Sequence, residues 1–423
     1  MNMQTGKTLT VAEAALCEAY DHAVGELPGD AAVLTARDGL ISDFKAAGLP
    51  TRRVEAWHYT DLKALLRAVP AVVPAASAGK AAPLVAGAPV LLVANGVAEK
   101  ASAAGVTVGT YADALADGSA AAGLVARDGD DVIGRLNGAF VRDGFVLDIP
   151  AGAELETPVE VQTVQNAGQT HTRFAATFGA GAKATVIQRH LAVGDETAFV
   201  TTVSELALED GADVTWVVQQ AQGASDTHLG QIRVRLGADT QLRLYVVNAG
   251  GKLVRQEIHV EVAGEGSDFK LRGINLLGAD THNDVTFTVG HNVANTTSTE
   301  VIRNVVFDRA RGVFQGQIRV APDAQKTDAK MSCNTLLLSD EADFSAKPEL
   351  EIFADDVQCG HGATVIDIDH TQLFYLMARG IPENKARAML VNAFVAEIVE
   401  ELEDEPLVEA LERVIGAWLE KHA

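Results

Sequence analysis

The strongest constraint on this chain is a long run of short, strand-like segments between residues 144 and 368. Val, Ile, Thr and Phe alternate there with polar residues, as in Gln231–Leu236, which predicts β-strands with two unlike faces. Gly-Ala pairs that signal turns begin at Gly181, Gly211 and Gly237, 30 and then 26 residues apart. The region therefore has a quasi-regular repeat.

A stacked parallel β-helix explains this repeat better than the other β folds. No helical segment of a βαβ unit fits between the strands, and the region is long for a single sandwich. In a stacked β-helix, each coil buries its apolar side chains against the coils above and below it. The sequence thus predicts a mainly β protein with a parallel β-helix core over residues 144–368.

Helical patterns flank this core on both sides. Apolar residues recur at helical spacing within residues 8–66, and the Ala/Pro/Val-rich segment 69–90 suits a linker. We therefore expect an N-terminal helical region with its linker over residues 1–143 and a C-terminal helical domain over residues 369–423.

The C-terminal domain carries two apolar stripes. Leu390, Phe394 and Ile398 belong to the first, and the second follows Pro406. These helices are expected either to cap the open end of the strand stack or to dock a partner, because an unprotected end exposes strand edges.

Charge and cysteine content restrict the partners and the compartment. The 423 residues include 57 acidic and 34 basic ones, for a formal net charge of -23. Such a body repels nucleic acid and anionic membranes, so we expect neither as a partner. Cys17, Cys333 and Cys359 are too few and scattered for a disulfide framework. The start lacks a signal-peptide pattern and no long apolar run occurs, so a cytoplasmic protein is expected.

Common catalytic and nucleotide-binding motifs do not occur in the sequence. There is no Gly-x-x-x-x-Gly-Lys-Ser/Thr loop, so the chain has no Walker-type ATP site of its own. Gly-x-Ser-x-Gly and His-Glu-x-x-His are absent as well. We therefore assign no catalytic residue and no cofactor-binding residue, and expect no enzyme activity.

One short pattern stands out, Cys359-Gly-His361, downstream of Asp355 and Asp356. Residues two apart on a strand project to the same face, so the thiolate and the imidazole can converge on one metal ion. This pair suits zinc, copper or iron, including iron–sulfur species. Two ligands do not complete a site, so the others must come from elsewhere in the chain or from another subunit. A Cys–His nucleophile fits less well, because no oxyanion hole or orienting group is evident.

Four segments form a further pattern: Lys326–Lys330, Asn334–Ser339, Lys347–Val365 and Leu373–Pro382. Together they resemble the SufB/SufD family of iron–sulfur cluster assembly proteins. The stretch Pro50–Leu62 and the chain length are similar to the SufD branch rather than to the longer SufB.

The resemblance implies a right-handed parallel β-helix between helical parts, and a complex with one SufB and two copies of the ATPase SufC. SufC would bind the C-terminal helical domain. The nascent cluster would be held transiently between SufB and this chain, where His361 falls on the family's histidine and Cys359 on the neighbouring cysteine. Cys333 stands where the family usually has a polar residue. Whether the complex binds flavin, and whether a SufD homodimer forms without SufB, is left open.

Three functions are thus weighed. The first is a scaffold subunit of the SufBCD complex. The second is a β-helix carbohydrate-active enzyme, although the acidic residues are spread rather than grouped at the spacing of the coils. The third is a self-contained metalloenzyme.

Overall fold

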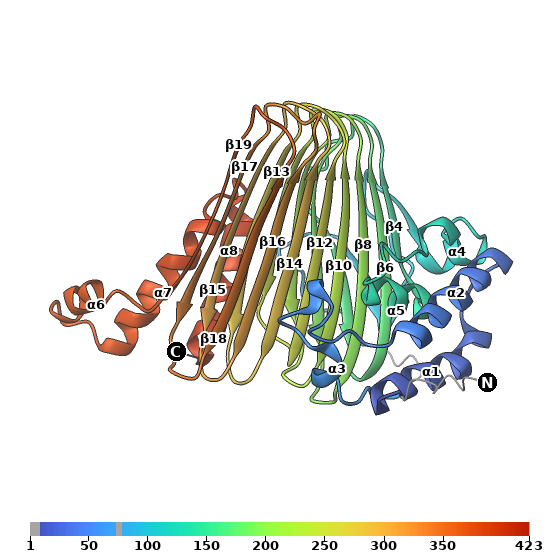
Figure 1. Cartoon of the computed structure of the whole chain (residues 1–423), viewed down its shortest axis with the longest axis horizontal. Helices are drawn as coiled ribbons and strands as arrows, with labels where there is room; N and C mark the ends of the chain where they lie inside the picture. Colours follow the sequence, from blue (N-terminus) through green and yellow to red (C-terminus); the bar gives the residue numbers. More distant parts are fainter. Residues whose placement is uncertain (1–8, 73–77, 423) are drawn as a thin grey trace, which may run out of the picture.

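The computed structural model describes residues 9–72 and 78–422 as a β-solenoid of about eight turns with helices at both ends (Figure 1). The strands from β4 onward pair in parallel with the strand two places along the chain, so successive strands alternate between two sheets. The ten-stranded sheet contains β1, β2 and the odd-numbered strands from β5 to β19; the nine-stranded sheet contains β3 and the even-numbered strands from β4 to β18. The predicted mainly β fold with a parallel β-helix core is confirmed.

The strands are β1 (Val90–Ala94), β2 (Val97–Ala98), β3 (Thr107–Thr110), β4 (Asp143–Ile149), β5 (Val159–Gln165), β6 (Gly168–Phe178), β7 (Lys183–Ala192), β8 (Ala198–Leu208), β9 (Asp213–Ala221), β10 (Thr227–Leu236), β11 (Gln241–Asn248), β12 (Leu253–Val262), β13 (Asp268–Leu277), β14 (His282–His291), β15 (Thr297–Val306), β16 (Arg311–Val320), β17 (Asp328–Leu337), β18 (Asp343–Ile352) and β19 (Gln358–Ile366). The α-helices are α1 (Val11–Ala23), α2 (Ala31–Ala47), α3 (Leu62–Leu65), α4 (Tyr111–Ala116), α5 (Val132–Phe140), α6 (His370–Met377), α7 (Glu383–Val399) and α8 (Glu405–His422).

The Gly-Ala turn signals mark corners of the solenoid. Gly181 and Gly211 have φ angles of 68° and 73°, a conformation that disfavours side chains with a Cβ. The Gly181 amide donates to the carbonyl oxygen of Asp210 in the next coil, and the Gly211 amide donates to that of Ala238. The sequence repeat therefore corresponds to turns that stack on one another.

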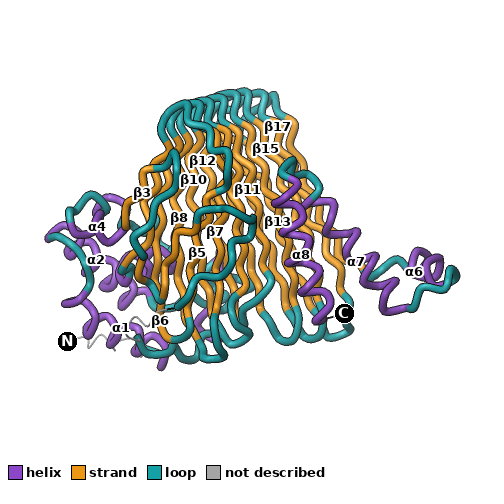
Figure 2. The backbone as a smooth tube through the Cα atoms, turned by 180° about the vertical axis from the view of Figure 1, so that it is seen from behind, coloured by secondary structure: helices purple, strands orange, loops and turns teal. Residues whose placement is uncertain are grey.

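The main core lies between the two sheets, and each sheet also packs against helices on its outer face. Large inward side chains such as Phe178 and Trp216 fill the interior. Outside the nine-stranded sheet, Phe199 and Leu229 pack against the N-terminal helices. Outside the ten-stranded sheet, Ile274 packs against α7 and α8. Helical parts thus cover opposite faces, near opposite ends of the stack (Figures 1 and 2).

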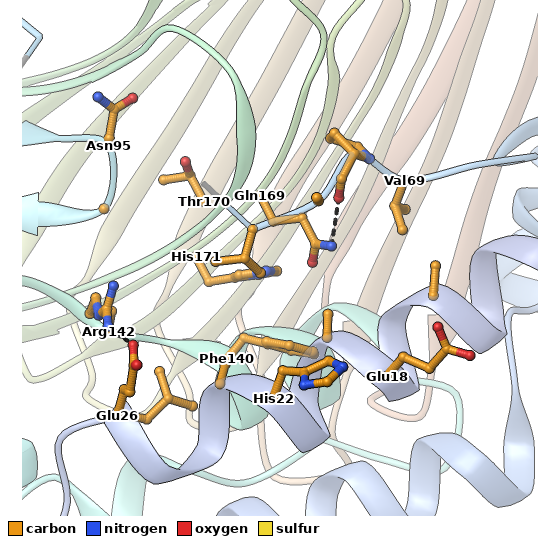
Figure 3. Close-up of a pocket in the computed structure, with 18 residues that line it drawn as sticks. Glu18, His22, Glu26, Val69, Asn95, Phe140, Arg142, Gln169, Thr170 and His171 are labelled. Carbon is orange, nitrogen blue, oxygen red and sulfur yellow. Dashed lines mark hydrogen bonds and ion pairs between the residues drawn. The ribbon is translucent and has the colours of Figure 1, made fainter. Parts of the chain in front are cut away.

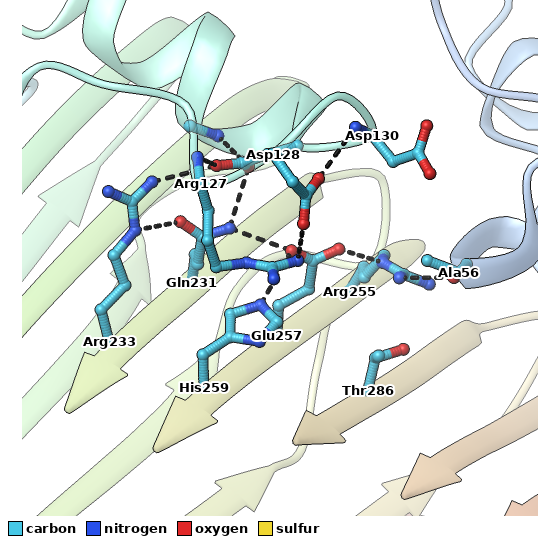
Figure 4. A network of polar contacts seen from close by, with 12 residues as sticks. Ala56, Arg127, Asp128, Asp130, Gln231, Arg233, Arg255, Glu257, His259 and Thr286 are labelled. Carbon is cyan, nitrogen blue, oxygen red and sulfur yellow. Dashed lines mark hydrogen bonds and ion pairs between the residues drawn. The ribbon is translucent and has the colours of Figure 1, made fainter. Parts of the chain in front are cut away.

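The connector after Pro50 is fastened to the nine-stranded sheet by a buried polar network. Arg255 on β12 is fully buried; it stacks on Trp57 at 3.8 Å and donates to the Ala56 carbonyl at 2.7 Å (Figure 4). Arg255 also pairs with Glu257 and Asp284. Burial alone would raise the pKa of Glu257, but Arg255 and its hydrogen-bonding neighbours hold that pKa well below its usual range. The stretch that resembles SufD therefore has a definite docking position.

The C-terminal helices do not cap the strand stack. Both α7 and α8 lie against the outer face of the ten-stranded sheet, with Leu407, Leu411 and Ile415 buried there. The short helix α6 projects away from the body (Figures 1 and 2). The expectation that these helices cap the open end of the strand stack is therefore not met, and the expectation that they dock a partner stays a prediction.

Two further observations bear on the N-terminal part. Residues 1–143 also contribute β1, β2 and β3 to the sheets, which the sequence pattern did not predict. The linker prediction over 69–90 includes residues 73–77, which lie outside the described residues. Among the helices of the described residues, none is long and apolar enough to cross a membrane.

Candidate functional site

Cys359 and His361 lie on β19, the last strand of the solenoid. Parallel register with β17 aligns Cys359 with Ala329 and His361 with Met331. Ala329 and Met331 are buried in the core between the sheets, and Cys359 packs partly against that core. Because alternate residues of a strand share a face, His361 is on the inward side with Cys359. The predicted common face is therefore present.

These two residues nevertheless remain accessible, because their coil is the last one. In both sheets the order of strands ends at this coil, with β18 in one and β19 in the other. Cys359 is half-buried and His361 is exposed. Apolar side chains at the same end, including Ile352, Val365 and Ile366, are also exposed. The inward-facing side chains of β19 are thus not covered by another coil and can contact a second protein at this end.

The Cys359 thiol is held in its neutral form. Its pKa is raised mainly by burial and further by the negative charge of Asp328, against the opposing effect of a backbone hydrogen bond at Ala329. A thiolate is the form that binds metal ions, so a nearby cation or a bound metal would be needed to ionise this thiol. Within residues 9–72 and 78–422, no group of three or more His, Cys, Asp or Glu side chains is placed to hold a metal ion. A site based on Cys359 and His361 is therefore incomplete in the single chain.

The nearby acidic and cysteine residues do not complete it. Asp356 belongs to the corner before β19, where it pairs with Lys326, and its backbone amide donates to Gln325 at 2.9 Å. Cys333 is fully buried on β17, and burial raises its thiol pKa to about 12. The Asn304 amide donates to its Sγ atom at 3.4 Å. Cys333 thus lies one coil below the open end.

A buried carboxyl group in the same column was missed by sequence reasoning. Glu300 on β15 aligns with Met331, which aligns with His361, so the three occupy successive coils. Glu300 is fully buried, and burial raises its pKa to about 8 against weaker opposing effects of Ser298 and Arg272. From sequence, a single Glu in a strand of alternating polar and apolar residues is expected to face solvent. Only the pairing register of β15 shows that Glu300 faces the interior.

The protruding helix α6 presents a second unusual surface. Phe374, Tyr375 and Met377 are exposed apolar or aromatic side chains on this helix, and Met389 of α7 is exposed as well. Contiguous exposed apolar side chains often mark protein–protein contact sites. This surface lies at the same end of the molecule as β19 (Figure 1).

Comparison with known proteins agrees with this architecture. Residues 161–394 match the family described as SUF system FeS cluster assembly, SufBD core domain. The chain is 31% identical over 402 residues to the iron–sulfur cluster assembly protein SufD of Escherichia coli, covering 88% of this chain and 90% of that protein. It is 28% identical over 289 residues to SufD of Bacillus subtilis, covering 66% and 65% of the two chains.

The family match spans more than half of the chain, and the match to the Escherichia coli protein spans nearly all of both sequences. The solenoid with helical flanks is the fold that the resemblance of the sequence motifs implied. This chain therefore belongs to the SufB/SufD family of iron–sulfur cluster assembly proteins and is SufD-like.

Proposed function

We propose that this chain is a non-catalytic, cytoplasmic scaffold subunit of a SufBCD complex, in which it pairs with SufB and docks the ATPase SufC. The observation that carries the proposal is the uncovered last coil, which brings Cys359 and His361 to an open end of the solenoid. A thiol and an imidazole at an open end supply only part of a ligand set. They suit an iron–sulfur cluster whose remaining ligands come from a second subunit.

Pairing with SufB would use the outer edge of β18 and β19. A strand at the edge of a sheet offers unpaired amide and carbonyl groups to another chain, and apolar neighbours add buried area. In this proposal the nascent iron–sulfur cluster is transient cargo shared with SufB, with His361 and Cys359 as ligands from this chain.

Docking of SufC would use the C-terminal helical domain. Its apolar stripes on α7 and α8 are occupied by the sheet, so the exposed aromatic side chains of α6 are the better contact surface. ATP hydrolysis would come from SufC, consistent with the absence of a Walker loop here. Membership in a cluster assembly family leaves no observation that favours the carbohydrate-active enzyme or the self-contained metalloenzyme.

The edge is tested by placing charge on it. The double variant Val365→Lys, Ile366→Lys should abolish co-purification with SufB. Burying two lysine side chains at the interface would cost desolvation free energy, and charged residues at a strand edge disfavour pairing with another strand. Val193→Lys is the matched control, since Val193 is 52% exposed and Ile366 is 54% exposed. Undiminished SufB retention by the double variant would move the pairing surface elsewhere. The size of the isolated chain in solution would report whether the same end also forms a homodimer.

A further inference from the structure

A cavity of about 580 Å³ lies between α1 and the first coils of the solenoid, at the other end of the molecule from β19 (Figures 1 and 3). On one side, Ala15, Ala19 and Ala23 form a smooth wall, since residues four apart share a helix face. With a rise of about 1.5 Å for each residue, this wall runs about 12 Å along the helix. The segment Val69–Val72 lines the cavity opposite α1 (Figure 3).

The apolar part of this lining is accessible. Ala15, Ala19 and Ala23 are each partly exposed, and Val72 is 42% exposed. A concave site of this size with apolar walls is typical of small-molecule binding. A ligand that covered these side chains would gain free energy, because apolar surface would be removed from water.

The polar side chains at the floor of the cavity add little polar surface to it. Gln169 and His171 of β6 are only 7% and 6% exposed. The Gln169 amide donates to the Pro70 carbonyl at 2.7 Å, and the His171 ring stacks on Phe140 with centroids 4.7 Å apart. The part of a ligand that enters this cavity should therefore be apolar.

The charged side chains that line the cavity are at its rim. Glu18 and Glu26 lie towards the two ends of the α1 side, with His22 between them (Figure 3). The Arg142 guanidinium lies 3.7 Å from the Glu26 carboxylate, which is too long for a hydrogen bond. In the part of the chain that the structure describes, no cationic side chain pairs with Glu18. One carboxylate without a counterion is thus next to the apolar wall.

The charges at the rim favour a cationic ligand and oppose an anionic one. With His22 counted as neutral, two carboxylates stand against the single guanidinium of Arg142. The whole chain has a formal net charge of -23, so its long-range potential has the same sign as the rim. A phosphate or carboxylate group would be repelled, whereas an ammonium group beside Glu18 would gain an ion pair and stay in contact with water.

We propose that this cavity binds a small amphipathic amine, a molecule with an apolar body and one ammonium group at its end. The apolar body would lie between the alanine wall of α1 and the segment Val69–Val72. The ammonium group would pair with the Glu18 carboxylate at the rim. This site is independent of the cluster-binding function proposed above.

Naphthylmethylamine, a cation at neutral pH, is a suitable probe for the full-length chain. Its matched controls are naphthylmethanol, in which a hydroxyl group replaces the ammonium group, and the anion naphthoate. Calorimetric titration should show saturable binding of the amine, about threefold tighter than binding of the alcohol, with naphthoate the weakest. Added salt should reduce the difference between the amine and the alcohol, because salt screens an exposed ion pair.

Three variants of the chain locate the site. Glu18→Gln removes the charge but keeps the size of the side chain, so it should weaken binding of the amine about threefold and leave binding of the alcohol unchanged. Glu412→Gln, at an exposed position of α8 towards the other end of the molecule, changes the net charge equally and should bind the amine as the unmodified chain does. Ala19→Trp fills the cavity and should abolish binding of both compounds. Circular dichroism and thermal unfolding establish that each variant is folded.

The proposal is overturned if naphthylmethanol or naphthoate binds at least as tightly as the amine, because charge then does not select the ligand. It is also overturned if Glu18→Gln and Glu412→Gln bind the amine equally, or if Ala19→Trp retains binding. Failure of the amine to bind up to its solubility limit would overturn it as well, since the cavity would then hold only solvent.

Discussion

At the scale of single residues, the position of a side chain in the stack determines its chemistry. His361, Met331 and Glu300 occupy the same inward register on successive odd-numbered strands. The first is exposed at the open end, whereas the other two are buried. Within two coils, the same inward register thus changes from an accessible imidazole, His361, to a buried, neutral carboxylic acid, Glu300.

Glu300 gives this chain a pH-dependent stability. Its pKa is raised from 4.5 to about 8, so the folded state binds this proton more tightly than the unfolded state. The stabilising contribution is fully present below about pH 4.5 and declines as the pH rises to about 8, by up to about 1.4 kcal/mol for each pH unit. Glu300→Gln should therefore unfold at a higher temperature than the unmodified chain at pH 8, with the gap shrinking towards pH 5.

Thermal unfolding across this pH range measures the effect. Glu99→Gln, at an exposed position, is the control and should show no such growing gap. A constant difference between Glu300→Gln and the unmodified chain at every pH would contradict an ionisable, buried Glu300.

The residue pattern anticipated the pairing of Cys359 with His361, because strand alternation alone places them on one face. It could not show that their coil is uncovered, since that depends on where distant helices pack. The inward position of Glu300 could not be predicted from the sequence for a related reason. On β15 the inward positions include the polar Ser298 and Glu300, whereas the outward Val301 and Val305 pack beneath α7 and α8, so hydrophobicity does not identify the inner face.

At the scale of elements, the apolar stripes of the C-terminal helices were identified from spacing, but the surface they cover was not. The helices α7 and α8 bury those stripes on the ten-stranded sheet. Truncation from Leu407 would therefore expose part of the sheet as well as remove any docking surface. The short helix α6 can be altered without this effect.

We predict that Phe374→Ser with Tyr375→Ser weakens retention of SufC about tenfold or more, because aromatic anchors at interfaces carry much of the binding energy. Neither side chain is buried in this chain, so the unfolding temperature should not change. Val11→Ser on α1 is the matched control, since Val11 is 74% exposed and Phe374 is 72% exposed. If SufC binds the double variant as tightly as the unmodified chain, docking uses another surface.

At the scale of the whole molecule, the helical parts leave one end of the solenoid free. The N-terminal helices cover the nine-stranded sheet near one end, and α7 and α8 cover the ten-stranded sheet nearer the other (Figures 1 and 2). The last coil, with β18 and β19, and the protruding α6 therefore share one end. The contacts proposed above with SufB and SufC would therefore both be made at this end.

The solenoid itself was predictable because turn residues and alternating strands recur along the sequence. Gly181 and Gly211 are two such turn residues. Its limits were less predictable. The strands β1 to β3 extend it at the N-terminal side. The hairpin of β1 and β2 has a local signal in the turn Asn95-Gly96, whose φ angles are 46° and 80°. The pairing of β1 with β5 has none, because it joins segments far apart in sequence.

The central claim is that His361 is a cluster ligand at the open end. Its most direct test is the iron and acid-labile sulfide content of the anaerobically purified complex, co-expressed with SufB and SufC and carrying His361→Ala. Cluster content should be abolished or strongly reduced while all three subunits still co-purify, because one coordinate bond is lost and an exposed side chain costs little fold stability. His58→Ala, at another exposed histidine, should leave the content unchanged. Normal iron and sulfide in His361→Ala, or their full recovery in His361→Asn, would contradict the ligand role.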